Sequence, residues 1–131
     1  TASTGSATID IDFDLVQVPG SATAWYELQF TTDLVAQASN EGFRIVDTGG
    51  AVISSVVITA NGAATGTGTV RITLDQSPAS GAFIEYAYTG TTPETHSCAY
   101  GNLTDTDTQA SLADVGRILI NPSPCFRKAI T

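Results

Sequence analysis

The residues best suited to chemistry lie in the last third of the chain, which holds both cysteines and the only histidine. His96 and Cys98 lie two residues apart, and Cys125 follows much later. Structural zinc sites usually take four ligands in closely spaced pairs such as CxxC or HxxxH, and this spacing is missing. A catalytic Cys–His pair is equally weak, because the same cysteine is better explained as bonded. We therefore expect neither a zinc site nor a cysteine nucleophile.

An even cysteine count in a chain of secreted character predicts a disulfide bond between Cys98 and Cys125. The alternative is a pair of free, buried thiols. By limiting the unfolded chain, the bond would stabilise the fold by roughly 3–4 kcal/mol. It would tie the loop before Tyr100 to the C-terminal segment.

Asp105 and Asp107 lie two residues apart in Thr-Asp-Thr-Asp-Thr, shortly after Asn102. Calcium binds several oxygen ligands, and this spacing can supply two carboxylates with backbone carbonyls between them. The alternative is a turn in which the carboxylates accept hydrogen bonds from their own backbone. Calcium at Asp105 and Asp107 is the one cofactor that the sequence suggests.

Alternation of apolar and polar residues dominates the chain and predicts β-strands, whereas helix-period patterning is almost absent. In residues 9–15, isoleucine, phenylalanine and leucine alternate with Asp10, Asp12 and Asp14. Successive carboxylates on one strand face lie about 7 Å apart, too far to close on one ion, so this row predicts a solvated face or a charged edge. Further strands are expected at residues 24–30, 43–46, 51–59, 69–74, 82–88, 117–120 and 125–130, and short helical turns at 32–41 and 111–115.

These short strands, separated by turn signals, predict an all-β fold: an antiparallel, immunoglobulin-like β-sandwich, with a jelly-roll-like variant as the alternative. The length of 131 residues fits one domain. We expect a flexible N-terminal arm or linker at residues 1–8 and a single β-sandwich domain at residues 9–131.

The charge balance of the chain argues against two classes of partner, nucleic acids and anionic membranes. Thirteen acidic and five basic residues give a formal net charge of −8, which repels nucleic acid and anionic membranes. No apolar run approaches the ~20 residues of a membrane span. Low charge, abundant small hydroxyl residues and the absence of methionine are typical of a processed extracellular protein, so we expect a secreted, cell-surface or virion location.

Aromatic residues suggest a ligand. If Tyr26, Leu28 and Phe30 face the core, Trp25 points outward beside polar neighbours, as in β-sandwiches that stack a flat ring on sugars. The alternative is that Trp25 fills the core in a register shifted by one residue. Tyr100, in the loop after Cys98, is the second aromatic side chain that we expect to be accessible.

Residues 100–107, Tyr-Gly-Asn-Leu-Thr-Asp-Thr-Asp, with Ile-Leu-Ile-Asn at 118–121 and Cys-Phe-Arg-Lys-Ala at 125–129, carry a resemblance. They resemble the ends of β-sandwich modules at the C-termini of bacterial and phage-encoded polysaccharide-active proteins. Those modules carry a G-N-L-R-D-S-D-like loop before a strand with an L-x-N-W-like patch; here Thr104 replaces the basic residue and Pro122 the aromatic one. Residues 70–74 and 79–86 are also similar to bacterial immunoglobulin-like repeats. Both resemblances imply an extracellular accessory or structural domain.

The first functional expectation is a non-catalytic module that binds polysaccharide through Trp25, Tyr100, Asn102, Asp105 and Asp107. The second is a structural subunit of a virion, surface layer or filament, whose partners are neighbouring subunits, including copies of itself. No Ser–His–Asp arrangement or nucleophile elbow is visible, so we do not expect an enzyme.

Overall fold

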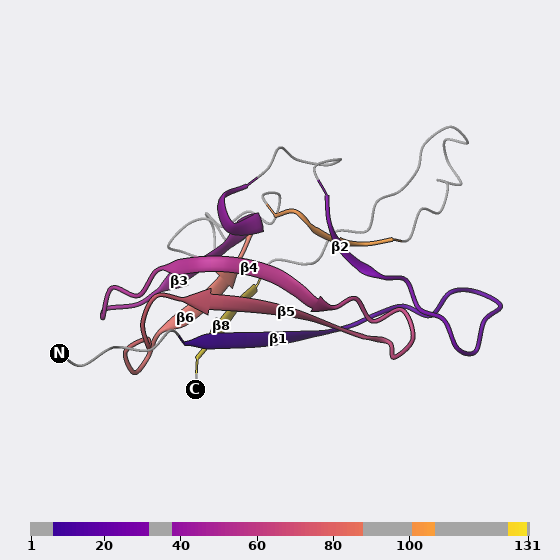
Figure 1. Ribbon diagram of the computed structural model, residues 1–131, viewed down its shortest axis with the longest axis horizontal. Coiled ribbons are helices and arrows are strands. Elements are labelled where there is room, and N and C mark those ends of the chain that lie inside the picture. Colours follow the sequence, from indigo (N-terminus) through magenta and orange to yellow (C-terminus); the bar gives the residue numbers. More distant parts are fainter. Residues whose placement is uncertain (1–6, 32–37, 88–100, 107–125, 131) are drawn as a thin grey trace.

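The computed structural model describes residues 7–31, 38–87, 101–106 and 126–130, and Figure 1 shows their arrangement. These residues form eight strands and one 3-10 helix. In chain order they are β1 (Thr8–Asp14), β2 (Leu28–Phe30), η1 (Ser39–Gly42), β3 (Phe43–Val46), β4 (Ile53–Ala60), β5 (Thr67–Leu74), β6 (Phe83–Tyr86), β7 (Leu103–Asp105) and β8 (Phe126–Ala129). Each strand pairing among them is antiparallel, so the predicted all-β class is confirmed.

The strands form two layers and a ribbon. One sheet has the order β1-β5-β4 and the other β3-β6-β8, while β2 pairs with β7. In Figure 1 the first sheet lies in front of the strands of the second. The Phe13 ring on β1 lies 6.1 Å from the Phe126 ring on β8, so the sheets share a core. This arrangement is consistent with a β-sandwich. The immunoglobulin-like strand order stays a prediction.

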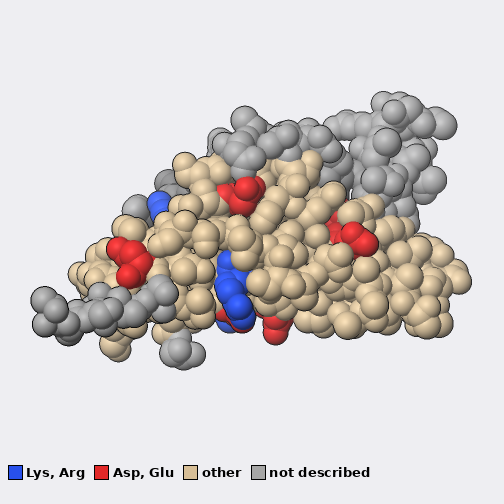
Figure 2. Space-filling model, viewed as in Figure 1, with Lys and Arg blue, Asp and Glu red and all other residues tan. Residues whose placement is uncertain are grey.

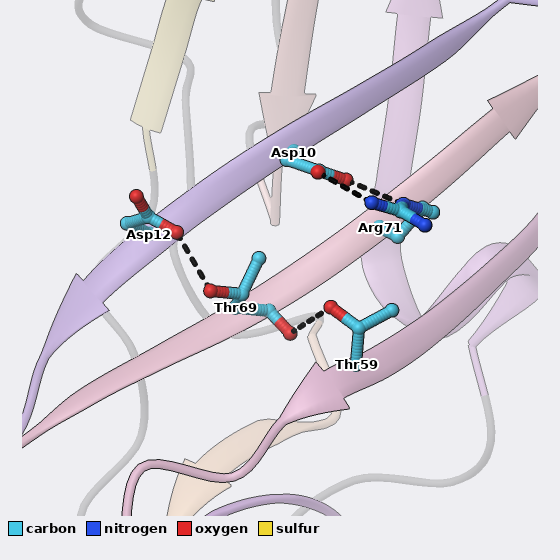
Figure 3. A network of polar contacts seen from close by, with 5 residues as sticks. All are labelled: Asp10, Asp12, Thr59, Thr69 and Arg71. Carbon is cyan, nitrogen blue, oxygen red and sulfur yellow. Dashed lines mark hydrogen bonds and ion pairs between the residues drawn. The ribbon is translucent and has the colours of Figure 1, made fainter. Parts of the chain in front are cut away.

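Strand β1 follows the alternation in the sequence. Ile11 is buried, whereas Asp10 and Asp12 are exposed on the outer face. Asp10 accepts two hydrogen bonds of 2.8 Å from Arg71 on β5, and Asp12 accepts one of 2.7 Å from Thr69 (Figure 3). The row expected as a solvated face or a charged edge is thus both: its carboxylates are exposed, and β1 ends its sheet among the described strands.

Strand β5 forms the middle of the first sheet. Val70, Ile72 and Leu74 are fully buried on its inner face, as their spacing predicted. Burying each such side chain contributes about 1.5–3 kcal/mol. This strand therefore anchors the core against which the second sheet packs.

Tyr86 connects the core to the ribbon. Its ring lies 4.8 Å from the Phe43 ring and 5.7 Å from the Phe126 ring. Its buried hydroxyl accepts a 2.9 Å hydrogen bond from the Leu103 N–H and donates one of 3.3 Å to the Leu103 carbonyl. A Cβ atom at residue 101 would lie 2.1 Å from this hydroxyl, which explains Gly101. Burial raises the pKa of Tyr86.

The structure differs from the sequence predictions at several element boundaries. Of the strand expected at 24–30, only Leu28–Phe30 forms a ladder, while Trp25 makes an isolated bridge to Gln17. The strand expected at 51–59 runs instead over Ile53–Ala60. The described end of the helical turn expected at 32–41 is the 3-10 helix Ser39–Gly42. The elements expected at 111–115 and 117–120 lie outside the described residues.

Candidate functional site

The ribbon of β2 and β7 joins two segments that the sequence analysis singled out separately. Leu28 is the partner of Asp105, and Gln29 is the partner of Thr104. The pairing continues beyond the strands, because the Glu27 N–H donates to the Thr106 hydroxyl at 2.8 Å and the Thr106 N–H donates to the Glu27 carbonyl at 2.9 Å. The segment after Trp25 therefore lies directly beside the threonine- and aspartate-rich loop (Figure 1).

Apolar side chains hold this ribbon on the core. Leu28 and Leu103 belong to the buried cluster, with 6% and 0% of their surfaces exposed. The Leu28 N–H also donates to the Asn61 carbonyl at 2.8 Å, which attaches the ribbon to the turn between β4 and β5. The polar groups at the ribbon's outer edge are thus carried on a fixed support.

Trp25 lies outside the buried core cluster and is half-buried. Its backbone N–H donates to the Ala63 carbonyl at 3.0 Å, in the turn between β4 and β5. Its indole rests on Gly66, where a Cβ atom would come within 2.8 Å of the indole Nε1. Gly66 also has a φ of +77°, which disfavours other residues. The turn therefore fixes the indole at the surface while leaving part of it exposed.

Polar groups accompany the indole. Glu27, two residues after Trp25, is exposed, whereas Gln29, Asp105 and Thr106 are half-buried. The Gln29 side-chain amide donates to the Asp105 carbonyl at 3.2 Å across the ribbon. The outer edge thus combines an aromatic surface with the exposed Glu27 carboxylate and the Thr106 hydroxyl, which are groups that bind sugars by stacking and hydrogen bonding. Asp105, the partner of the buried Leu28, lies on the side of its strand that faces the core.

Asn102 does not take the surface position that we expected for a ligand contact. Only 1% of its surface is exposed. Its side-chain oxygen accepts the Ala38 N–H at 2.8 Å, and its amide donates to the Thr31 carbonyl at 2.9 Å. Its own N–H donates to the Glu41 carbonyl at 3.1 Å. A buried amide needs hydrogen-bond partners for its polar atoms. Asn102 therefore uses these atoms to join the chain segments that support the ribbon, and does not present them to a ligand.

The remaining predicted site residues lie outside the described residues: Tyr100 and Asp107 of the sugar and calcium sites, and Cys98 and Cys125 of the disulfide. Of the two predicted calcium ligands, only Asp105 lies among the described residues. Within residues 7–31, 38–87, 101–106 and 126–130, no group of three or more His, Cys, Asp or Glu side chains is arranged to hold a metal ion.

Two grooves follow the lateral edges of the two-layered fold. The larger, of about 450 Å³, lies between β3 and β4, which each end their sheets among the described strands. It is lined mainly by apolar residues, including Phe43, Ile45, Val52 and Ile53. The smaller, of about 290 Å³, lies between β1 and β8. Edge strands such as β3 and β4 can accept another strand, whereas the aspartates of β1 disfavour it.

Sequence reasoning missed a buried carboxylate. Glu85 lies on β6 between the core residues Ile84 and Tyr86, and only 3% of its side chain is exposed. It forms ion pairs with Arg44 on β3 and Arg127 on β8. The signal was a single acidic residue within an otherwise apolar and aromatic strand.

Comparison of the chain with known protein families, with curated proteins and with solved structures found no match. No helix in the described part of the chain is long and apolar enough to span a membrane.

Proposed function

We propose that this protein is a non-catalytic, extracellular β-sandwich module that binds carbohydrate through the outer edge of the β2–β7 ribbon. The observation that carries the proposal is the position of Trp25. Its indole lies outside the core, rests on Gly66 and is followed by the exposed Glu27. An indole held in one orientation can stack on a sugar ring at a small entropic cost.

The polar groups beside the indole would orient the bound sugar through hydrogen bonds. The exposed carboxylate of Glu27 can accept hydrogen bonds from sugar hydroxyls, and its backbone bonds to Thr106 fix its position on the ribbon. The resemblance of residues 100–107 to modules of polysaccharide-active proteins agrees with this ligand class. A single shallow site of this kind binds weakly, so useful affinity would come from several modules acting together.

Affinity electrophoresis tests the proposal. The wild type, Trp25→Ala and Trp25→Tyr are run through gels containing soluble xylan, mixed-linkage β-glucan, dextran or polygalacturonate. We expect at least one polysaccharide to retard the wild type, Trp25→Ala to lose that retardation and Trp25→Tyr, which keeps a ring, to retain part of it. Val57→Ala, which shortens an apolar side chain 45% exposed on β4, is the control. Equal retardation of the wild type and Trp25→Ala would place the binding elsewhere.

A second candidate function is a subunit of an extracellular assembly. The specific observation is the apolar groove between β3 and β4, where each strand has a partner on one side only among the described strands. A strand from a neighbouring subunit could pair with either edge and place its apolar side chains in the groove. Size-exclusion chromatography with light scattering distinguishes the candidates: assembly predicts a mass that rises with protein concentration, and a constant monomer mass contradicts it.

A further inference from the structure

The outer face of the β3-β6-β8 sheet carries a row of three charged side chains. Arg44, Glu85 and Arg127 are direct cross-strand partners on β3, β6 and β8. Because the neighbouring residues Ile84 and Tyr86 face the core, Glu85 lies on the opposite side of its strand. The row is thus part of the surface of this layer.

Glu85 holds both arginines. Arg44 donates to Oε2 of Glu85 from Nε at 2.9 Å and from Nη2, and Nε of Arg127 lies 3.4 Å from Oε1. The carboxylate is 3% exposed, whereas the side chains of Arg44 and Arg127 are 58% and 40% exposed. A buried carboxylate therefore orients two guanidinium groups that remain open to solvent.

Arg127 has a second contact that limits its motion. Its guanidinium carbon lies 4.1 Å from the centre of the Phe83 ring, within the range of cation–π attraction. A guanidinium group has five N–H donors, and the contacts with Glu85 engage only some of those on Arg44 and Arg127. The remaining donors have no partner among the described residues, so they are available to an anion.

The row has a charge of +1 on a chain whose formal net charge is −8. Arg71, on the other sheet, offers a contrast. Asp10 takes two of its donors in a bidentate ion pair, and Asp12 lies on the same exposed face (Figure 3). On that face Figure 2 shows acidic atoms scattered singly, with the basic atoms gathered mainly in one place. The Arg44–Glu85–Arg127 row, unlike the Arg71 pair, keeps an excess positive charge.

We infer that the Arg44–Glu85–Arg127 row binds the carboxylates of an acidic, uronate-containing polysaccharide. A guanidinium group matches a planar carboxylate through two parallel hydrogen bonds. Arg44 and Arg127 lie two strands apart, about 10 Å at the backbone, so they can engage two carboxylates of one extended chain. The choice of a polysaccharide over another polyanion rests on the proposed function, and the row is a second contact surface on another sheet.

Affinity electrophoresis with matched polymers tests this inference. Polygalacturonate and its fully methyl-esterified form share a backbone and differ in charge. We expect the wild type to bind polygalacturonate at least about tenfold more tightly than the ester, with an affinity that falls as NaCl rises. The double variant Arg44→Gln/Arg127→Gln should lose this preference, and Arg71→Gln, the matched control, should keep it.

A second variant covers the case in which the double variant fails to fold, since that change leaves Glu85 buried without its partners. Glu85→Gln keeps both arginines and raises the charge of the row from +1 to +2, so it should bind polygalacturonate several-fold more tightly than the wild type. Weaker or unchanged binding by Glu85→Gln contradicts the inference. Circular dichroism checks that each variant is folded.

Other outcomes separate this inference from the proposed function. Equal binding of the two polymers, or none of either, overturns the inference, as does an equal loss in Arg71→Gln. Trp25-dependent retardation by a neutral polysaccharide, together with equal binding of polygalacturonate by the wild type and by Arg44→Gln/Arg127→Gln, supports the proposed function and overturns the inference. Charge-dependent binding of a DNA oligonucleotide that equals the binding of polygalacturonate shows a general anion surface and also contradicts it.

Discussion

Asn102→Ala gives the clearest test of how the candidate site is supported. The substitution removes the bonds to the Ala38 N–H and the Thr31 carbonyl, which flank residues 32–37. Both bonds are partly buried, so each backbone group left without a partner should cost about 1–2 kcal/mol, in the lower part of the usual range. We therefore expect Asn102→Ala to lower the free energy of unfolding by about 2–4 kcal/mol in total.

Urea denaturation followed by circular dichroism and by Trp25 fluorescence measures this loss. Gln29→Ala is the matched control, because it removes one amide bond, to the Asp105 carbonyl, at a half-buried position. It should cost about 1 kcal/mol or less. Asn102→Asp should be at least as destabilising as Asn102→Ala, because a carboxylate cannot donate to the Thr31 carbonyl and would be buried. If Asn102→Ala costs no more than Gln29→Ala while polysaccharide binding is lost, Asn102 is a ligand contact and our account of it is wrong.

Two further predictions concern the turns. Gly66→Ala should lower the free energy of unfolding by about 1–2 kcal/mol and also shift the Trp25 emission, because its Cβ would lie 2.8 Å from the indole. The control is Gly20→Ala, at a similar φ of +82° with open space around it, which should lower stability without shifting the emission. Identical emission spectra for the two variants would contradict the contact between Gly66 and the indole. Hydrogen bonds from the N–H groups of Ala51, Gly49 and Ala79 lower the pKa of Asp47, so its stabilisation is present above the unfolded-state pKa and is lost as the pH falls through the lower folded-state pKa. Urea denaturation between about pH 2 and 5 should thus show a shallower pH dependence for Asp47→Asn than for the wild type, and identical slopes would refute this role.

The sequence predicted the faces of strands better than their partners. Alternation in β1 and β5 correctly separated Ile11 and Ile72 from Asp10 and Arg71, because burial on one face requires apolar residues at every second position. Alternation says nothing of which strand lies alongside. The pairing of Leu28 with Asp105 joins positions far apart in the chain, and no local pattern could indicate it.

Burial of polar residues was harder still to predict. Asn102 lies in a polar stretch that is typical of a surface loop, yet its amide is enclosed because two backbone segments need its donor and acceptor. Glu85 is buried because arginines on both neighbouring strands neutralise it, which depends on the register of three strands. The alternation left two positions open for Trp25, outward or in the core; the structure has it half-buried outside the core cluster, resting on a glycine that was not foreseen.

Fluorescence titration tests the central claim most directly, because Trp25 is the only tryptophan and its emission reports on the proposed site alone. The wild type is titrated with the polysaccharide that retards it in affinity gels. The control is a polysaccharide, dextran or xylan, that does not retard it. The account predicts a saturable change in Trp25 emission, and protection from acrylamide quenching, with the retarding polysaccharide only. Saturable binding that leaves both the emission and the quenching of Trp25 unchanged would contradict it.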